Sequence, residues 1–378
     1  MTATTARAAV LVRQAAPRPY ASSRPIEIAK VELDPLEYGE VQVAVASAGV
    51  CHSDLSTVDA TFVRPTPLVI GHEAAGTVEA VGPGVTRVQP GDKVVFSFVP
   101  TCGHCIECAS GRPALCEPGN RANAAATLMR GARRMRRNGE PLSMQLGVGG
   151  FATRTICAEE SLVRIPAATP LNIAALFGCA ALTGLGAIFN AAKVEPGTSV
   201  AIFGAGGVGL MALLGSRVAS ATDIVVVDPV PEKRALAAEL GATATIDPAA
   251  GDVAEQIRAA LHGRGAHYAI EAAGNTKVLE DAYASTAPGG TTVAVGLPRA
   301  EATAAIPHHL FVRQDRTLKG SFMGSSVPQR DIPRYIALWS AGKLPVERLV
   351  TGTTTLDGLN EALDALAEGR AVRTICVP

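Results

Sequence analysis

The pattern of hydrophobic and polar positions changes near residue 199. Before that point, short apolar runs alternate partly with polar residues and are separated by Pro, Gly and Asp, which indicates a β-rich fold. We expect strands at 8–12, 26–31, 41–46, 77–81 and 93–96. Short strands at this spacing favour a folded-over barrel or sandwich.

From Ser199 onward, short apolar strands alternate with helical patterns. This alternation predicts a parallel, doubly wound sheet. The expected strands are 199–203, 224–228, 244–246, 267–271 and 291–295, and the expected helices between them are 208–220, 232–240, 253–261 and 278–285. After Gly320 we expect helices at 332–339 and 359–367 and a final strand at 374–377, with the tail returning to the first domain.

The segment from Ile165 to Ala192 carries no charged side chain and imitates a membrane span. Pro166, Pro170 and several Gly and Asn residues interrupt it, so we expect a helix packed tightly between domains instead. The N-terminus combines one Arg with a short apolar run, which is too little for a signal peptide.

Composition limits the class of ligand. The 34 Lys and Arg balance the 34 Asp and Glu, so no global field attracts nucleic acid or an anionic membrane, and a small ligand is favoured. The eight Cys in 378 residues are partly clustered with His nearby, which favours reduced metal ligands over a disulfide framework. We therefore expect a cytoplasmic protein.

Four cysteines form the strongest motif. Their spacing, C-x2-C-x2-C-x7-C, is that of a closed four-thiolate zinc site, which fixes a loop and performs no reaction. The cysteines are Cys102, Cys105, Cys108 and Cys116.

A glycine fingerprint opens the doubly wound part. Gly204, Gly206 and Gly209 follow an expected strand and begin an expected helix, whose free N–H groups suit a pyrophosphate. Asp228 closes the next strand, where a carboxylate accepts hydrogen bonds from the adenosine ribose and repels a 2′-phosphate. The pattern therefore predicts NAD over NADP. The candidate cofactor-binding residues also include Gly207, Val208 and Gly296.

Cys51, His72 and Cys179 are scattered along the chain. Two thiolates and one imidazole make the three-ligand set of a catalytic zinc, with a fourth position open for water or substrate. Taken singly, Cys179 is more often a small buried hydrophobe, and His72 is more often a hydrogen-bonded core or loop residue. Together with the four-cysteine motif, the zinc interpretation is favoured.

With these motifs assembled, the chain resembles the zinc-dependent medium-chain alcohol dehydrogenases over nearly its whole length. The shared motifs are C-H-S-D from Cys51, G-H-E from Gly71, the four-cysteine lobe, G-C-A-A-L-T-G from Gly178, G-A-G-G-V-G from Gly204, V-V-D ending at Asp228 and V-R-T-I from Val372. The resemblance implies a GroES-like β-rich catalytic domain at 1–180 and 324–378 with both zinc sites, and a Rossmann NAD-binding domain at 181–323.

The resemblance also implies roles for individual residues. Cys51, His72 and Cys179 would bind a catalytic zinc that polarises the alcohol or carbonyl oxygen during hydride transfer, with Glu73 as an occasional alternative ligand. Asp54 would hydrogen-bond His72 from behind. The remaining implied roles are proton transfer by Ser53, contact with nicotinamide by Thr183, contact with the ribose by Lys233 and contact with the pyrophosphate by Arg373. Without the resemblance, Lys233 and Arg373 would be interpreted as surface charges.

Two positions depart from the family. Ser56 stands where many relatives carry the histidine that ends a proton relay. Water, the ribose hydroxyl and Ser56 stay open as the proton route. Our hypothesis of a weakened proton exit at low pH is tested by the pH–rate profile of a Ser56→His variant, and an unchanged acidic limb counts against it. His52 stands where relatives often have Arg on the pyrophosphate, which would loosen coenzyme binding slightly.

The sequence indicates less about the substrate than about the cofactor. Phe62 and Phe98 occupy pocket-lining positions of the family, which suggests an apolar cavity, although ordinary core packing is the alternative. A charged residue is expected in place of Phe62 in the glutathione-dependent formaldehyde group, so Phe62 argues against that activity. The arginine run from Arg130 to Arg137 is interpreted as a solvated loop, with an anionic-substrate dock as the alternative.

Three function classes follow. The favoured one is an NAD-dependent zinc alcohol dehydrogenase acting on a primary or aromatic alcohol or its aldehyde, with two zinc ions per chain. The alternatives are a thiol-adduct formaldehyde dehydrogenase or a biosynthetic carbonyl or iminium reductase of the same family, and a non-catalytic zinc and nucleotide binding protein. The family also implies a homodimer or homotetramer.

Overall fold

A computed structural model describes residues 4–378 and divides the chain into two compact units. Unit 1 comprises the chain up to Cys179 together with Val327–Ile336 and Val350–Pro378, and unit 2 comprises Ala180–Ser326 and Ala337–Leu349. The domain limits expected from the sequence, 1–180 with 324–378 and 181–323, lie within three residues of the limits at Cys179 and Val327. They differ in the assignment of 337–349.

Unit 1 is built on two sheets. One has the order β8-β7-β2-β1-β4-β9, and the other has the order β11-β6-β5-β3-β19-β18 with β10 paired to β3. The strands are β1 (Thr4–Leu11), β2 (Ile26–Leu33), β3 (Glu40–Val50), β4 (Leu68–Val69), β5 (Ala74–Val81), β6 (Lys93–Phe96), β7 (Met135–Arg137), β8 (Glu140–Pro141), β9 (Ser143–Met144), β10 (Arg154–Ala158), β11 (Leu162–Arg164), β18 (Val350–Thr354) and β19 (Arg373–Cys376).

Alternation along these strands creates the core of unit 1. Val41, Val43 and Val45 on β3 point to one face, where they join a buried cluster that includes Phe96 and Phe151. The helices of this part are α1 (Tyr20–Ser23), α2 (His52–Val58), α3 (Ile106–Ala109), α4 (Glu117–Ala124), α5 (Leu171–Ala174), α12 (Pro328–Ser340), which continues into unit 2, and α13 (Leu359–Ala367).

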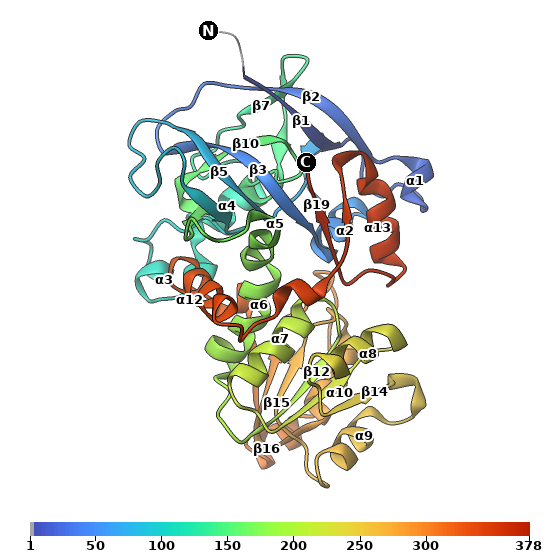
Figure 1. Ribbon diagram of the computed structural model, residues 1–378. Helices are drawn as coiled ribbons and strands as arrows, with labels where there is room; N and C mark the ends of the chain where they lie inside the picture. Colours follow the sequence, from blue (N-terminus) through green and yellow to red (C-terminus); the bar gives the residue numbers. More distant parts are fainter. Residues whose placement is uncertain (1–3) are drawn as a thin grey trace. The chain divides into compact units, whose positions relative to one another are not determined.

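The end of the chain joins the middle of the second sheet. β19 pairs antiparallel with β3, with Thr374 opposite Val50 and Ile375 opposite Gly49 (Figure 1). The strand expected at 374–377 is therefore present and shifted by one residue. This pairing places Arg373 beside the end of β3, where Cys51 follows.

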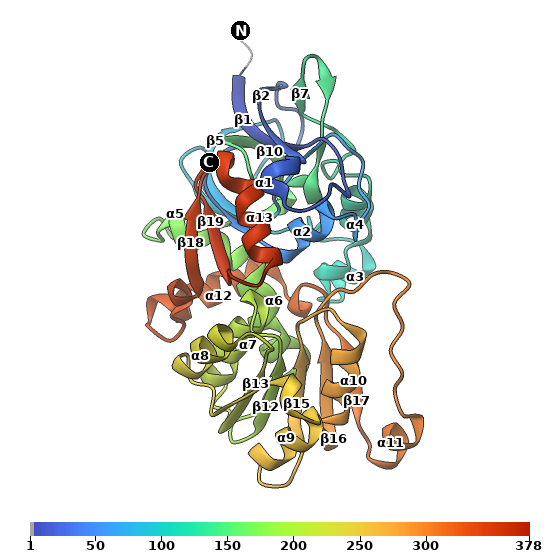
Figure 2. The ribbon, with the colours of Figure 1, turned by 90° about the vertical axis from the view of Figure 1, so that its right-hand side faces the viewer.

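Unit 2 contains one parallel sheet in the order β14-β13-β12-β15-β16-β17 (Figure 2). Its strands are β12 (Ser199–Phe203), β13 (Asp223–Val227), β14 (Ala244–Ile246), β15 (Ala266–Glu271), β16 (Thr286–Ala294) and β17 (Thr317–Gly320). Its helices are α6 (Ala180–Gly186), α7 (Gly207–Val218), α8 (Pro231–Glu239), α9 (Val253–Ala260), α10 (Thr276–Ala284) and α11 (His308–Arg313). Every strand and helix expected between 199 and 295 is present within a few residues, except that β16 begins five residues earlier than expected.

The strand order of unit 2 determines where a ligand can bind. In chain order the strands read 3-2-1-4-5-6, so the order reverses between β12 and β15. In open α/β sheets, ligands bind beyond the carboxyl ends of the strands at such a switch point. The loops after β12 and β15 therefore border the crevice expected for a dinucleotide.

The apolar segment from 165 to 192 is not the single helix that we expected. It consists of α5, a 3-10 turn at Ala175–Gly178, α6 and a π-helical turn at Ala187–Ala192. The helix breaks at Cys179, whose φ of −136° and ψ of −72° are not helical. Over residues 4–378, no single helix has the length and apolar character to cross a membrane. The bent pair Leu171–Gly178 and Ala180–Ala192 reaches that threshold by length and composition only.

Candidate active site

Cys51, His72 and Cys179 come together in unit 1. Their donor atoms all lie within 4.8 Å of one another, and the three side chains are buried. The Cys179 Sγ lies 3.5 Å from the His72 Nε2. Cys51 stands between β3 and α2, and His72 stands between β4 and β5. Three segments far apart in the sequence thus present two sulfurs and one nitrogen to a common point.

Glycines allow these close approaches. Gly71 has a φ of +100°, and a Cβ there would lie 2.5 Å from the Phe151 backbone N. At Gly178 a Cβ would lie 2.4 Å from the Phe96 carbonyl oxygen. A side chain at either position would force the adjoining backbone, and with it His72 or Cys179, to move, so both glycines help to form the group.

Asp54 holds two of the three ligand-bearing segments. Its side chain is fully buried, its Oδ1 lies 2.8 Å from His72 Nδ1, and its Oδ2 accepts from the Cys51 N–H at 2.9 Å. Because the carboxylate accepts a hydrogen bond from Nδ1–H, Nε2 is the ring nitrogen that faces the thiols. Burial lowers the pKa of His72, but the Asp54 charge and hydrogen bond outweigh it and hold that pKa well above its ordinary value.

The pKa values of the two thiols are shifted in opposite directions. The hydrogen bond with Cys179 holds the pKa of Cys51 well below the usual thiol range against the effect of burial, and the Arg373 charge assists. The pKa of Cys179 is raised well above that range by its contact with Cys51 and by burial. A thiolate, a second thiol and a correctly oriented imidazole fit a divalent, thiophilic cation such as zinc, which is bound by ligands in deprotonated form.

A buried ion pair lies next to this group. Glu73 Oε2 is 3.3 Å from Arg373 Nη1, and both side chains are at most 3% exposed. Burial raises the pKa of Glu73 to about 7. Burial lowers the pKa of Arg373, but the neighbouring Glu73 and Cys51 raise it by more. The pKa of Arg373 therefore lies above its usual value. Read from the sequence without the family resemblance, Arg373 is a surface charge. That interpretation is wrong, because β19 inserts beside β3 and carries Arg373 into the interior.

The other expected residues near this group differ in exposure. The Phe98 ring meets the His72 ring edge-on, with centroids 5.8 Å apart, so an apolar wall stands beside the ligand. Ser53 and Ser56 are half-buried on α2, whereas His52 is exposed. Phe62 is half-buried, and its carbonyl oxygen accepts from Gln14 at 2.9 Å.

Gln145 supports the site and was not expected from the sequence. Its Oε1 accepts from the Gly71 N–H at 2.6 Å, and its Nε2 donates to the Thr57 hydroxyl at 3.3 Å. It thus links the loop that carries His72 to α2. An isolated Gln outside any motif gives no local signal of such a contact.

The four-cysteine lobe forms a second donor group. The sulfurs of Cys102, Cys105, Cys108 and Cys116 lie within 4.8 Å of one another. Backbone hydrogen bonding at Cys108 is the main reason that the pKa of Cys105 falls to about 6 despite desolvation. The Cys105 N–H in turn donates to Cys102 Sγ at 3.3 Å. Backbone N–H groups directed at sulfur favour thiolates, as a structural zinc requires.

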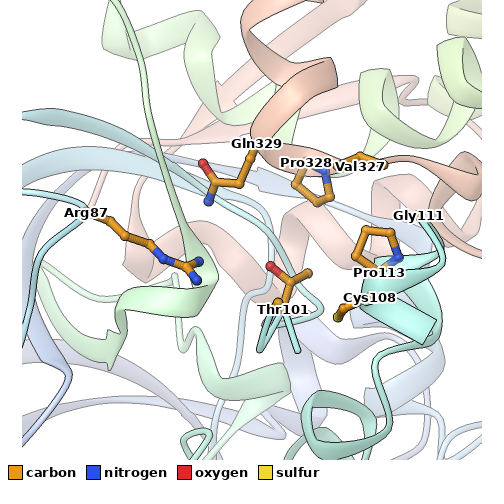
Figure 3. Close-up of a pocket in the computed structure, with 9 residues that line it drawn as sticks. Arg87, Thr101, Cys108, Gly111, Pro113, Val327, Pro328 and Gln329 are labelled. Carbon is orange, nitrogen blue, oxygen red and sulfur yellow. The ribbon is translucent and has the colours of Figure 1, made fainter. Parts of the chain in front are cut away.

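A pocket of about 340 Å³ lies beside this lobe in unit 1 (Figure 3). Arg87, Thr101 and Cys108 contribute to one part of its lining, and Val327, Pro328 and Gln329 contribute to another. The trio Cys51, His72 and Cys179 is not part of this lining. The pocket is therefore separate from the group with metal-binding geometry.

The arginine run is occupied by ion pairs. Arg134 pairs with Glu37 and Glu40, and Arg130 pairs with Glu160. Arg136 contacts Asp34, and Arg137 contacts Glu27. These carboxylates neutralise four arginines of the run, whereas Arg133 donates to the Ala125 carbonyl oxygen. The pairing favours a structural surface element over a dock for an anionic substrate.

In unit 2 the glycine fingerprint has the expected backbone form. Gly204 has a φ of +100°, and a Cβ on Gly209 would lie 1.8 Å from the Gly204 oxygen, so both positions require glycine. A Cβ on Gly206 would meet nothing within 4 Å, which leaves the space above the N-terminus of α7 open. Asp228 Oδ2 accepts from the Ala205 N–H at 2.7 Å, so the carboxylate lies against the fingerprint turn.

The remaining expected coenzyme residues also lie in unit 2. Thr183 is buried on α6, Lys233 is half-buried on α8, and Gly296 follows β16. Lys233 is therefore not a fully exposed surface charge.

Comparisons with known proteins identify the family. Residues 37–167 match the alcohol dehydrogenase GroES-like domain, and residues 207–341 match the zinc-binding dehydrogenase domain. A geraniol dehydrogenase from Castellaniella defragrans is 40% identical, with 93% of this chain and 94% of the relative covered. An NDMA-dependent alcohol dehydrogenase from Amycolatopsis methanolica is 37% identical, with 94% and 96% covered.

Solved structures of similar proteins support the same family. A zinc-binding-domain alcohol dehydrogenase protein from Burkholderia ambifaria is 35% identical and has a TM-score of 0.93 over 99% of both chains. A benzyl alcohol dehydrogenase from Acinetobacter calcoaceticus is 31% identical and has a TM-score of 0.92, again over 99% of both chains. The chain belongs to the zinc-dependent medium-chain alcohol dehydrogenases, and it is an oxidoreductase that acts on CH–OH groups. The expected GroES-like and Rossmann folds are confirmed.

The two donor groups predict two zinc ions per chain with separate functions. Cys105→Ala should lower the zinc content from two towards one and reduce thermal stability, because the lobe loses a ligand. Zinc analysis together with thermal unfolding checks this expectation. Loss of turnover in a Cys105→Ala protein of unchanged stability and assembly would contradict a purely structural lobe.

Asp54→Asn tests whether Asp54 orients the group of Cys51, His72 and Cys179 for zinc. The amide retains the shape but removes the charge that holds His72 Nδ1–H, so zinc affinity or turnover should fall roughly 10–100-fold. Zinc analysis after dialysis against a chelator, combined with steady-state kinetics, measures both effects. Asp59→Asn on the exposed end of α2 is the matched control. Equal zinc retention and turnover in Asp54→Asn would remove Asp54 from the site.

Proposed function

We propose that the chain interconverts primary allylic or aromatic alcohols and their aldehydes, using zinc held by Cys51, His72 and Cys179 together with NAD(H). The observation that carries the proposal is the buried trio of donor atoms, oriented by Asp54. Zinc in such a site supplies Lewis acidity to the substrate oxygen, and NAD supplies the hydride acceptor.

The side chains around the trio support this chemistry. Asp54 fixes the His72 tautomer, and Arg373 places a positive charge beside Cys51 and Glu73. Ser53 directly follows the Cys51–His52 pair and is half-buried, which suits its assignment to passing the alcohol proton toward solvent. Ser56 lies three residues further along α2, on the same helical face, and is also half-buried.

The substrate class follows from the apolar wall and from the relatives. Phe98 stands edge-on to His72 and favours an apolar group on the carbinol carbon. Two of the relatives are named for geraniol and benzyl alcohol, which both carry unsaturation next to the carbinol carbon. The neutralised arginine run supports an uncharged substrate.

Two further properties are proposed. All eight cysteines are free: six lie in the two donor groups, and Cys157 and Cys376 are buried. Free cysteines in these positions support a reducing compartment such as the cytoplasm. β17 is an edge strand of the unit 2 sheet, and the neighbouring α11 exposes Phe311 and Val312, which supports a homodimer or homotetramer.

The function is tested by following NADH over a panel of alcohols. We expect turnover with geraniol and benzyl alcohol, weaker turnover with ethanol, and no requirement for a low-molecular-weight thiol. Parallel assays contain NDMA, because one relative is named for dependence on it. Strict dependence on thiol would favour the formaldehyde dehydrogenase alternative. Absence of turnover in a fully metallated, NAD-binding protein would favour the non-catalytic alternative.

Coenzyme choice should depend on Asp228. Its carboxylate is buried at the end of β13, and its Oδ2 is bonded to the fingerprint turn. Asp228→Ala removes the negative charge that repels a 2′-phosphate, so the preference for NAD over NADP in kcat/KM should fall by at least about tenfold. Steady-state kinetics with both coenzymes measure this ratio, with Asp223→Ala at the start of the same strand as the control. An unchanged ratio would exclude Asp228 as the selecting group.

A further inference from the structure

A second buried carboxylate lies at the carboxyl end of the central strands of the unit 2 sheet and has no role in the function described so far. Glu271 is the last residue of β15, is 2% exposed, and stands beside Phe203 in the register of β12 and β15. Phe203 directly precedes Gly204, so Glu271 lies at the strand-order switch point, next to the fingerprint turn.

Glu271 organises the turn that follows it. Its Oε1 accepts from the Ala273 N–H at 2.7 Å and from the Gly274 N–H at 2.6 Å. Burial raises its pKa, and these N–H groups oppose that rise by stabilising the ionised form. One carboxylate oxygen thus accepts hydrogen bonds from two backbone N–H groups of the turn. Without Glu271 these two N–H groups would be unpaired.

This turn touches the loops on both sides. A Cβ on Gly204 would lie 3.4 Å from the Ala272 carbonyl carbon and from the Ala273 nitrogen. A Cβ on Gly296 would lie 2.1 Å from the Gly274 nitrogen and 2.9 Å from Glu271 Oε2. The turn therefore fits between the fingerprint loop and the loop after β16, and Glu271 fixes its position.

The order of the strands indicates which half of the coenzyme this turn meets. Asp228, at the end of β13, lies on one side of β12 and is placed for the adenosine ribose, with the pyrophosphate over the fingerprint at β12. An extended dinucleotide then directs its other half toward β15 and β16. The Glu271 turn lies on that nicotinamide side.

We propose that Glu271 is a positioning residue of the nicotinamide half-site, which acts by holding the Ala272–Gly274 turn against Gly204 and Gly296. This inference rests on the proposed use of NAD. The carboxylate does not need to touch the coenzyme. It fixes the backbone that lines the crevice, so its loss should weaken contacts to the nicotinamide half and spare the adenosine half.

The test compares NADH with AMP, which contains only the adenosine half. In Glu271→Gln we expect the Kd of NADH to rise roughly tenfold and the Kd of AMP to change by less than about twofold, measured by calorimetry on the zinc-loaded protein. The KM for NAD should rise more than kcat falls. Glu255→Gln, on the exposed face of α9, is the control and should match the wild type in both Kd values.

A second variant keeps Glu271 but disturbs the same turn. In Gly296→Ala the new Cβ must displace the Gly274 backbone, so we expect the same selective loss of NADH binding. Normal NADH binding by Glu271→Gln would overturn the proposal, and so would an equal loss of AMP binding, which indicates general damage to the unit. A wild-type protein that binds AMP but not NADH would contradict the proposed function itself, because Glu271 is intact there.

Discussion

The site depends most directly on the fully buried Asp54 carboxylate, whose two oxygens serve two different segments. One oxygen lies 2.8 Å from His72 Nδ1, and the other accepts from the Cys51 N–H at 2.9 Å. A carboxylate without these partners would be costly to bury, so the interaction stabilises the charge and the ligand geometry together. Because this contact occupies His72 Nδ1, it leaves Nε2 to face the thiols, so a residue outside the trio sets which nitrogen the trio presents.

The Glu73–Arg373 pair extends the same principle to the end of the chain. Arg373 is 3% exposed and comes from β19, which joins the sheet beside β3. Removing either partner would leave an uncompensated buried charge next to Cys51. The C-terminal strand thus contributes to the electrostatics of a thiol more than 300 positions earlier in the sequence.

In both units, buried carboxylates beside the candidate sites accept hydrogen bonds from backbone N–H groups. Asp54 accepts at the start of α2, Asp228 accepts from the Ala205 and Val230 N–H groups, and Glu271 accepts at the turn after β15. Each stands where a strand or loop ends and where backbone donors would otherwise be unpaired. The turns that border the ligand sites are therefore held by charge, whereas the sheets beneath them are held by packing of apolar side chains.

Local patterns were sufficient for much of the molecule. The strands and helices between 199 and 295, the glycine fingerprint and the four-cysteine lobe could be predicted because each depends on residues close together in the sequence. The break at Cys179 could not be predicted, since Ala/Gly-rich sequence is compatible with a continuous helix and the non-helical backbone there follows from packing. The ion pairs of the arginine run could not be predicted either, because Arg134 contacts Glu40 and Arg136 contacts Asp34 although the partners lie far apart in the sequence.

The sequence by itself determined the chemistry of the donor sets, namely two thiols with an imidazole and four thiols in one lobe, and it determined the alternation that makes the parallel sheet. Only the tertiary structure decided that Arg373 is buried beside Glu73, that Gln145 supports the His72 loop, and that Glu271 lies at the strand-order switch point. The physical reason is the separation along the chain of the residues that interact. Hydrophobic period, turn residues and ligand spacing act between near neighbours, whereas burial and charge pairing depend on which distant strands become adjacent.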